Sequence, residues 1–372
     1  MKQGLVILSF DYLYQGGISS FCVNLRSGLK KILRTSPLVI SQYPVKNQVQ
    51  LVEAPDMPVP EARISREIKA FFYLLKIKKK QNLVICATWY PEAFLCSMVG
   101  VEYVILAHGT EIMLTKNFMK RLIWEPLKRV ILRNAKYVIA NSHFTAKLVL
   151  AVEPRVKVIA LPLAVDIDKF FPGNPEAAKV KLGVSGKKVI STVSRVLRYK
   201  GHETVFSALK KLELQQLEQI VYLVVGTGPY LESLKQLAKR LQIEKYVRFM
   251  GSVADEERLL VYQASNLFLL CSWEEKEEQN VEGFGLVLLE AAACGAAVLG
   301  TDSGGIPDAV NESHGGILIP ERGVDELAAH LRSLVENPEI ARFSGKRLTE
   351  FVRSECTWEK YATRFLNEIH HE

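Results

Sequence analysis

Two glutamates, Glu282 and Glu290, bracket an apolar run in the second half of the chain. Glycines 283 and 285 follow the first glutamate, and the good helix formers of 286–294 come next. We therefore expect a loop that carries Glu282, followed by a helix that carries Glu290. A carboxylate on an apolar helix face needs a partner, because burying an unpaired charge is costly. The spacing indicates either a ligand site or a packed helix in which the two glutamates fall eight apart by chance.

The start of this expected helix is itself suited to ligand binding. Its first turn, Phe284 to Leu286, has backbone N–H groups without an intrahelical acceptor, and the helix dipole is positive there. Such a position favours oxygen-rich ligands, either phosphates or sugar hydroxyls. Glu290 lies ~7 Å further along the helix axis than Gly285.

The segment from Val281 to Glu290 resembles the E-x7-E motif of family 4 retaining glycosyltransferases, which have the GT-B fold. Its wording is most similar to the phosphatidylinositol mannosyltransferase branch. The resemblance implies that Glu282 and the amides after it hold the donor sugar, and that Glu290 holds the ribose of the nucleotide. The residues that supply those amides are Gly283, Phe284, Gly285 and Leu286.

Two segments of the first half match the same family. Gly16 and Gly17 follow an apolar run; they form either an ordinary strand-to-helix turn or a loop whose amides approach a phosphate. His108 follows the expected strand Tyr103–Ala107, where α/β sheets place ligand groups, although a lone histidine is more often structural. The resemblance implies that the two glycines approach the donor diphosphate and that His108 lies by the reacting carbon of the sugar.

Three segments of the second half extend the match. Arg195 and Lys200 flank a short loop similar to the S-R-(x)n-K-G segment of the family, in which the two cations grip the leaving diphosphate. Gly226 opens Gly-Thr-Gly-Pro, a weak signal alone because the third glycine of a dinucleotide fingerprint is missing. In relatives, the residue at Met250 contacts the base through its backbone.

The resemblance implies no cofactor and no metal, because fixed cations and dipoles stabilise the departing diphosphate. Asp166 and Asp168 have the spacing of a metal clamp. However, their segment resembles the G-V-D-x-x-x-F-x-P connector between the two GT-B domains. No side chain is an obvious nucleophile for a covalent intermediate, so attack on the same face of the sugar, assisted by the leaving phosphate, is our hypothesis.

The composition is that of a soluble globular protein. The chain has 372 residues, too many for one ordinary core, with 48% hydrophobic and 24% charged residues. Its apolar runs are shorter than the roughly 18 residues that a membrane-spanning helix needs. The hydrophobic segment near its start is too short to be the core of a signal peptide. Six scattered cysteines without a Cys-x-x-Cys pair argue against a zinc site and favour a cytoplasmic location.

Charge is unevenly distributed along the chain. Residues 1–175 hold 24 Lys and Arg against 12 Asp and Glu, a balance of +12, whereas the remainder has 48 − 24 = 24 against 40 − 12 = 28, a balance of −4. A basic half indicates an anionic partner. We find no nucleic-acid-binding motif. The helical stretches 66–80 and 116–124 mix cations with bulky apolar groups, so peripheral contact with an anionic membrane, on the inner face of the cell membrane, is the alternative to a solvated basic face.

Alternating strand and helix patterns predict an α/β protein with parallel sheets. With the resemblance, the expectation is the GT-B fold, two Rossmann-like domains that face a deep cleft. We expect an acceptor domain at 1–165, a linker at 166–183 and a nucleotide-sugar domain at 184–349, with a helix at about 350–372 packing back on the first domain. Pro126 is expected to separate two helices.

The function implied is a retaining glycosyltransferase that moves a hexose from a nucleotide sugar to a lipid or saccharide acceptor. The wording of the motif favours α-mannose from GDP-mannose, with UDP-linked sugars next. A nucleotide-sugar hydrolase or epimerase on the same fold is one alternative, and a non-catalytic partner that kept the fold is another.

Overall fold

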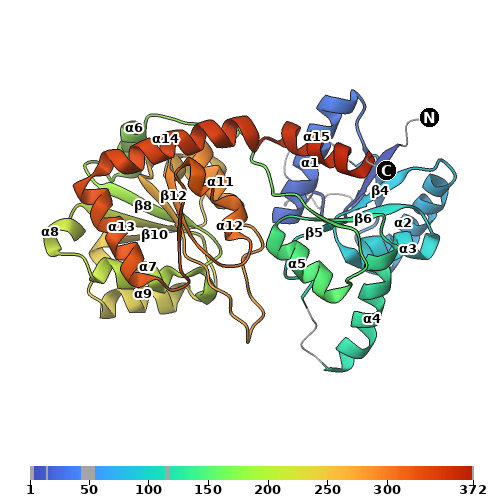
Figure 1. The fold of residues 1–372 in the computed structure, drawn as a ribbon, viewed down its shortest axis with the longest axis horizontal. Coiled ribbons are helices and arrows are strands. Elements are labelled where there is room, and N and C mark those ends of the chain that lie inside the picture. Colours follow the sequence, from blue (N-terminus) through green and yellow to red (C-terminus); the bar gives the residue numbers. More distant parts are fainter. Residues whose placement is uncertain (1–3, 14–15, 43–54, 114–117, 371–372) are drawn as a thin grey trace. The chain divides into compact units, whose positions relative to one another are not determined.

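Strands alternate with helices through most of the computed structural model, which describes residues 4–13, 16–42, 55–113 and 118–370 (Figure 1). The described residues divide into two units. Unit 1 comprises Met1–Pro162 and Trp358–Glu372, and unit 2 comprises Leu163–Thr357.

Unit 1 is built on a seven-stranded parallel sheet with the order β3-β2-β1-β4-β5-β6-β7. Two of its strands, the short β3 and β7, were not anticipated from the sequence. The strands are β1 (Leu5–Leu8), β2 (Leu38–Gln42), β3 (Met57–Val59), β4 (Leu83–Cys86), β5 (Tyr103–Ala107), β6 (Tyr137–Ala140) and β7 (Val158–Ala160). The helices are α1 (Gly17–Leu33), α2 (Arg63–Lys78), α3 (Phe94–Val99), α4 (Phe118–Asn134), α5 (His143–Val152) and α15 (Trp358–His370).

Unit 2 has a six-stranded parallel sheet with the order β10-β9-β8-β11-β12-β13. The strands are β8 (Lys188–Val193), β9 (Ile220–Val225), β10 (Val247–Gly251), β11 (Leu267–Leu270), β12 (Ala297–Thr301) and β13 (Ile317–Ile319). The helices are α6 (Pro175–Leu182), α7 (His202–Lys210), α8 (Leu214–Leu217), α9 (Leu231–Arg240), α10 (Asp255–Ala264), α11 (Leu286–Ala293), α12 (Ile306–Ala309), α13 (Val324–Glu336) and α14 (Pro338–Glu355).

Both faces of the unit 2 sheet are buried, which explains why its strands are apolar throughout. In β9, Leu223 and Val225 join one hydrophobic cluster, together with residues of α6, α10, α11 and α14. Tyr222 and Val224 point to the opposite face and join a second cluster, with residues of α7, α9 and α13. Alternate side chains therefore contact helices on opposite sides, which is the arrangement of a doubly wound parallel sheet. The prediction of two α/β units with parallel sheets is confirmed.

The structure differs from the predicted linker and from the predicted C-terminal helix. The expected linker at 166–183 contains α6, which packs on α10 within unit 2. The expected helix at about 350–372 is two helices, α14 in unit 2 and α15 in unit 1, and residues 371–372 lie outside the described part. Buried Trp358, Tyr361 and Phe365 anchor α15 in unit 1, where it packs on α1.

The prediction that Pro126 separates two helices is wrong, because α4 runs from Phe118 to Asn134 through that proline. Pro126 is exposed, as is Leu122 four residues earlier, so the carbonyl that loses its amide partner can meet water instead. Residues 116 and 117 of the expected helical stretch 116–124 lie outside the described residues.

Candidate active site

The candidate site residues of unit 2 follow the carboxyl ends of adjacent strands. Arg195 and Lys200 come after β8, Gly226 after β9, and Glu282 after β11. Since all strands of this sheet are parallel, these loops emerge at one edge. Strand order also reverses at β8, because β9 lies on one side of it and β11 on the other. Open α/β sheets bind ligands at such a switch point.

An ion pair joins the loops on either side of this switch point. Lys200 Nζ lies 2.5 Å from Glu282 Oε2, and the two side chains are only 12% and 18% exposed. Burial alone would lower the pKa of Lys200, but Glu282 and Tyr199 together outweigh it, and the pKa is raised above its ordinary value. Lys200 therefore stays charged across the physiological range.

Arg195 differs from Lys200 in having no partner among the residues that the structure describes. Its side chain is exposed, and no described residue forms a hydrogen bond or ion pair with it. The loop thus presents one paired and one unpaired cation, the second of which is free to bind an anion in its planar fork geometry.

Close backbone contacts hold the loop that carries both cations. A Cβ at Gly226 would overlap the carbonyl oxygen of Ser194, and one at Gly201 would overlap that of Cys271. Both glycines have positive φ angles, +125° and +76°. These positions therefore require glycine on two grounds, the backbone conformation and the lack of space.

A buried polar network supports the same loop from beneath. His202 Nδ1 lies 2.8 Å from Tyr222 Oη, and its Nε2 lies 3.4 Å from Ser194 Oγ. The Tyr222 hydroxyl in turn donates to Thr192 Oγ1 at 2.8 Å. Burial, followed by the charge of Lys200, lowers the pKa of His202 to about 4. The imidazole is therefore neutral at pH 7 and acts here as a hydrogen-bonding residue.

Glu282 is followed by backbone amides that have no hydrogen-bond acceptor in the described part of the chain, those of Gly283, Phe284 and Leu286. Helix α11 begins at Leu286, two residues later than predicted, because Gly285 adopts a left-handed conformation with φ +91°. The carbonyl of Glu282 accepts from the amide of Gly305 at 2.8 Å, which fixes the loop from the side of β12.

Glu290 is buried one helical turn further on, where its Oε2 accepts from the hydroxyl of Tyr262 at 2.6 Å. Burial raises the pKa of this carboxyl above its ordinary value, and the charge of Arg258 and the hydrogen bond from Tyr262 oppose the rise. Tyr262 lies within an ordinary helix pattern and no motif includes it, so reasoning from the sequence missed it. Met250 is half-buried in β10, whose pairing with β9 shifts register between Phe249 and Gly251.

The candidate residues of unit 1 also follow strand ends, those of β1 and β5. Gly16 caps α1 and Gly17 opens it, both are exposed, and a Cβ at either would meet no described atom within 4 Å. The half-buried His108 has its Nε2 2.9 Å from the Ala87 carbonyl oxygen, which makes Nε2 the protonated nitrogen. The rings of Phe21 and His108 are in edge-to-face contact, with their centroids 5.6 Å apart.

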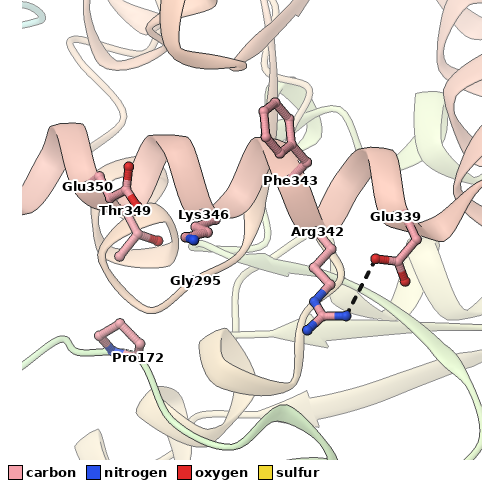
Figure 2. A pocket seen from close by; sticks show the side chains of 8 residues that line it. All are labelled: Pro172, Gly295, Glu339, Arg342, Phe343, Lys346, Thr349 and Glu350. Atoms are coloured by element: carbon pink, nitrogen blue, oxygen red, sulfur yellow. Dashed lines mark hydrogen bonds and ion pairs between the residues drawn. The ribbon is translucent and has the colours of Figure 1, made fainter.

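A hollow in unit 2 is separate from the candidate site. A hollow of about 530 Å³ in unit 2 lies against one face of α14, at the end of α11 opposite Glu282, and contains none of the predicted site residues (Figure 2). Its lining residues are Pro172, Gly295, Glu339, Arg342, Phe343, Lys346, Thr349 and Glu350. Within the described ranges, no cluster of three or more His, Cys, Asp or Glu side chains could hold a metal ion. None of the helices described is long and apolar enough to cross a membrane.

The two units, each built on a parallel sheet, have the GT-B fold that the sequence predicted. HepE from Anabaena, solved in complex with UDP, matches the structure with a TM-score of 0.78 at 17% identity, covering 99% of each chain. At that identity the likeness establishes the fold alone.

Residues 174–349, which lie within unit 2, match the model of the family described as glycosyl transferases group 1. This part of the chain is therefore similar to the group 1 glycosyltransferases. The predicted resemblance and the predicted fold are confirmed.

Two curated relatives illustrate the range of this similarity. One is the GDP-mannose-dependent alpha-(1-6)-phosphatidylinositol monomannoside mannosyltransferase of Mycobacterium tuberculosis, 28% identical over 60% of this chain and 58% of its own. The other is the N-acetyl-alpha-D-glucosaminyl L-malate synthase of Bacillus anthracis, 29% identical over 78% of this chain and 76% of its own. The match to the mycobacterial enzyme thus spans less than two thirds of that protein, and the two names differ in both donor and acceptor.

Proposed function

We propose that the chain is a retaining hexosyltransferase that moves α-mannose from GDP-mannose to a lipid-linked or saccharide acceptor. The observation that carries the proposal is the Lys200–Glu282 ion pair at the switch point of the unit 2 sheet, beside the unpaired Arg195 and the free amides before α11. This arrangement offers cations to a diphosphate and a carboxylate to sugar hydroxyls within one loop cluster. The choice of mannose rests on the wording of the E-x7-E segment and on the name of the mycobacterial relative.

In the proposed reaction, the bond between the sugar C1 and the β-phosphate oxygen breaks while the acceptor oxygen forms a bond to C1 on the same face. The acceptor proton passes to the leaving phosphate. Arg195 and Lys200 stabilise the charge that develops on this phosphate, which lowers the barrier most if both are fixed before reaction. Because these cations are part of the protein, we propose that transfer requires no metal. The roles expected of His108, Gly16, Gly17, Gly226 and Met250 stay predictions.

The ion pair has a consequence for how the donor binds. In the free protein, Lys200 and Glu282 neutralise each other at 2.5 Å. A bound diphosphate competes for Lys200 and so frees Glu282 to accept from sugar hydroxyls. We therefore expect the nucleotide part of the donor to bind by itself, and the free sugar to bind weakly when the nucleotide is absent.

The test is a thermal-shift screen with GDP, UDP and their sugar conjugates, followed by transfer assays. GDP-mannose should raise the melting temperature, because a ligand that binds only the folded state stabilises it. NMR of the product should give an α linkage. A β-linked product would rule out retention, donor turnover that is independent of any acceptor would favour a hydrolase or epimerase, and binding without turnover would favour a non-catalytic partner.

A UDP-linked sugar is the second candidate donor. It is favoured by the UDP bound to HepE, a protein of the same fold, and by the N-acetylglucosaminyl name of the Bacillus relative. A larger thermal shift with UDP-glucose or UDP-N-acetylglucosamine than with GDP-mannose would replace the donor while leaving the reaction class unchanged.

We further propose that unit 1 contacts an anionic membrane. Helix α2 exposes an apolar stripe at i, i+4 and i+8, namely Ile64, Ile68 and Phe72, and the exposed Lys69 and Lys76 flank it. Helix α4 exposes a similar stripe, with Met119 and Ile123 each 70% exposed. Exposed apolar side chains next to lysines suit the interface of an anionic bilayer.

Vesicle sedimentation tests this contact. The protein should sediment with phosphatidylglycerol vesicles more than with phosphatidylcholine vesicles, and the double variant Ile68→Asp, Phe72→Asp should lose most of the difference. Phe343→Asp is the matched control, because Phe343 is 63% exposed on a helix of unit 2. Equal sedimentation of the double variant and the unaltered protein would refute the assignment to α2.

A further inference from the structure

We infer that Tyr262 is a positioning residue for Glu290, because its hydroxyl holds one carboxylate oxygen and leaves the other for the ribose hydroxyls of a bound nucleotide. The inference rests on the proposed function, in which Glu290 binds the ribose. It concerns a residue outside the E-x7-E segment, on a different helix.

The geometry of this pair is well constrained. The Tyr262 hydroxyl donates to Glu290 Oε2 at 2.6 Å, from α10 to α11. Tyr262 is fully buried. Its ring makes edge-to-face contacts with Phe170 and Phe268, with ring centroids 5.8 Å and 5.5 Å apart. The hydroxyl therefore has a fixed position, and the carboxylate that accepts from it is held in one orientation.

The second oxygen of the carboxylate is left available. An ionised carboxylate accepts several hydrogen bonds through its two oxygens. No described residue donates to Glu290 Oε1, and the residue as a whole is 8% exposed. A ribose carries two adjacent hydroxyls that can both donate to an oxygen in this position. Tyr262 thus determines which oxygen meets the nucleotide.

Tyr262 also favours the ionised form of Glu290. Burial is the largest influence and raises the pKa of this carboxyl, whereas Arg258 and then the Tyr262 hydroxyl lower it. Burial also raises the pKa of Tyr262 well above its usual value, so the phenol stays a donor. The charged and titratable groups that face Glu290 are Asp255, Arg258 and Tyr262 of α10, Lys169 before α6, and Cys294 after α11.

The effect of removing the hydroxyl on pH dependence follows directly. Without the hydrogen bond, the pKa of Glu290 rises further, so the carboxylate becomes protonated at a higher pH as the solution is acidified. A protonated carboxyl is a poorer acceptor for the ribose. Nucleotide affinity in Tyr262→Phe should therefore fall off at a higher pH than in the unaltered protein.

The experiment is calorimetric titration of the full chain with GDP or UDP, whichever binds, and with the corresponding 2′,3′-dideoxynucleoside diphosphate, from about pH 5 to pH 9. The unaltered protein should prefer the ribonucleotide. In Tyr262→Phe, the ratio of the two affinities should fall roughly tenfold, the scale of a hydrogen bond to a charged group. The affinity for the dideoxynucleotide should change little. The phosphate groups of the nucleotide titrate in the same way in the experiments with either protein. Their contribution therefore cancels when the two pH profiles are compared.

Tyr246→Phe is the matched control. Tyr246 is a buried tyrosine of unit 2 with no contact to Glu290 among the described residues, so the removal of its hydroxyl should change neither the preference nor the pH profile. Thermal melting checks that each variant folds. If Tyr262→Phe melts early, Tyr262→Met repeats the measurement with a side chain that also lacks the hydroxyl and adapts to the surrounding rings.

Glu290→Gln separates this inference from the proposed function. If Glu290→Gln loses the preference for the ribonucleotide and Tyr262→Phe retains both the preference and the original pH profile, the positioning role is overturned and the proposed function stands. If the unaltered protein binds neither nucleotide, the proposed function fails and the inference fails with it.

Discussion

The chemistry proposed at the scale of single residues depends on charges that are held in place before any ligand arrives. Lys200 and Arg195 lie on one loop but differ in environment, since Lys200 is paired with Glu282 whereas Arg195 is exposed and has no partner in the described part of the chain. A fixed cation lowers a barrier without reorganisation during the reaction, so its removal should affect turnover more than binding.

Lys200→Ala tests this expectation. We expect kcat to fall about a hundredfold or more, the scale seen when one preorganised group is removed, while KM for the donor changes less. Steady-state kinetics provide the measurement. Lys211→Ala is the control, because Lys211 forms an ion pair with Asp325 at 2.5 Å on the surface of the same unit. A similar loss in both variants would contradict a specific role for Lys200.

At the same scale, His202 makes the stability of the protein sensitive to acid. The pKa of the buried imidazole is about 4, below the ordinary value of 6.5, so between these values the unfolded chain binds a proton that the folded chain does not. This contribution to stability is complete above pH 6.5 and is lost as the pH falls toward 4.

The measurement is urea unfolding at pH 7 and pH 5 for the unaltered protein and for His202→Asn. Linkage gives a loss of about 2 kcal/mol from this group between the two pH values. The variant should lack that part of the loss, whatever its stability at pH 7. An equal loss in both proteins would mean that His202 titrates normally in the folded state.

At the scale of elements, the site is formed by loops that glycine allows to approach closely. The turn after β9 lies against Ser194, the residue before Arg195, and only the missing Cβ of Gly226 permits this contact. The position of Arg195 and Lys200 therefore depends on glycine at position 226.

Gly226→Ala compared with Gly186→Ala isolates this packing effect. Both glycines have positive φ angles, but a Cβ at Gly186 would meet nothing within 4 Å, whereas one at Gly226 would overlap a carbonyl oxygen. Gly186→Ala should cost about 1 kcal/mol, the lower end of the cost of backbone strain. Gly226→Ala should cost more and also weaken nucleotide binding, as measured by urea unfolding and calorimetry. Equal costs would show that conformation alone requires glycine at position 226.

The strands and helices that form the site were largely predictable from the sequence, whereas features that depend on contacts formed only after folding were not. Strands β8, β9 and β11 are apolar because both faces are buried, and that pattern is local. The predicted first residue of α11 was wrong by two positions, because the left-handed conformation of Gly285 delays the start of the helix and the local sequence does not indicate it. Tyr262 was missed for a similar reason, since its partner is 28 residues away and the contact exists only after folding.

The edge strands show the same limit. Strands β3, β7 and β13 contain three residues each, too few to display a periodic pattern, and all three lie at the margins of their sheets. A residue such as Met57 adopts an extended conformation because it pairs with Ile40, which its own neighbours in the sequence cannot indicate.

At the scale of the whole molecule, unit 1 is assembled from two separate parts of the chain. Helix α15 packs on α1, and a Cβ at Gly28 of α1 would overlap the carbonyl oxygen of Trp358. Gly28→Val should therefore separate the two helices and destabilise unit 1 by several kcal/mol, the scale of overpacking a buried contact. Hydrogen exchange should increase in the peptides of unit 1 and stay unchanged in those of unit 2. Uniform deprotection of both units would contradict this local effect.

The order of the two units along the chain affects their biosynthesis. All of Leu163–Thr357 is translated before α15, the helix that packs on α1. A chain that ends at residue 357 would thus contain all of unit 2 and an incomplete unit 1, with Phe21 lacking the Trp358 and Tyr361 rings that contact it. Chaperones that recognise exposed aromatic surface would therefore bind to the incomplete unit 1.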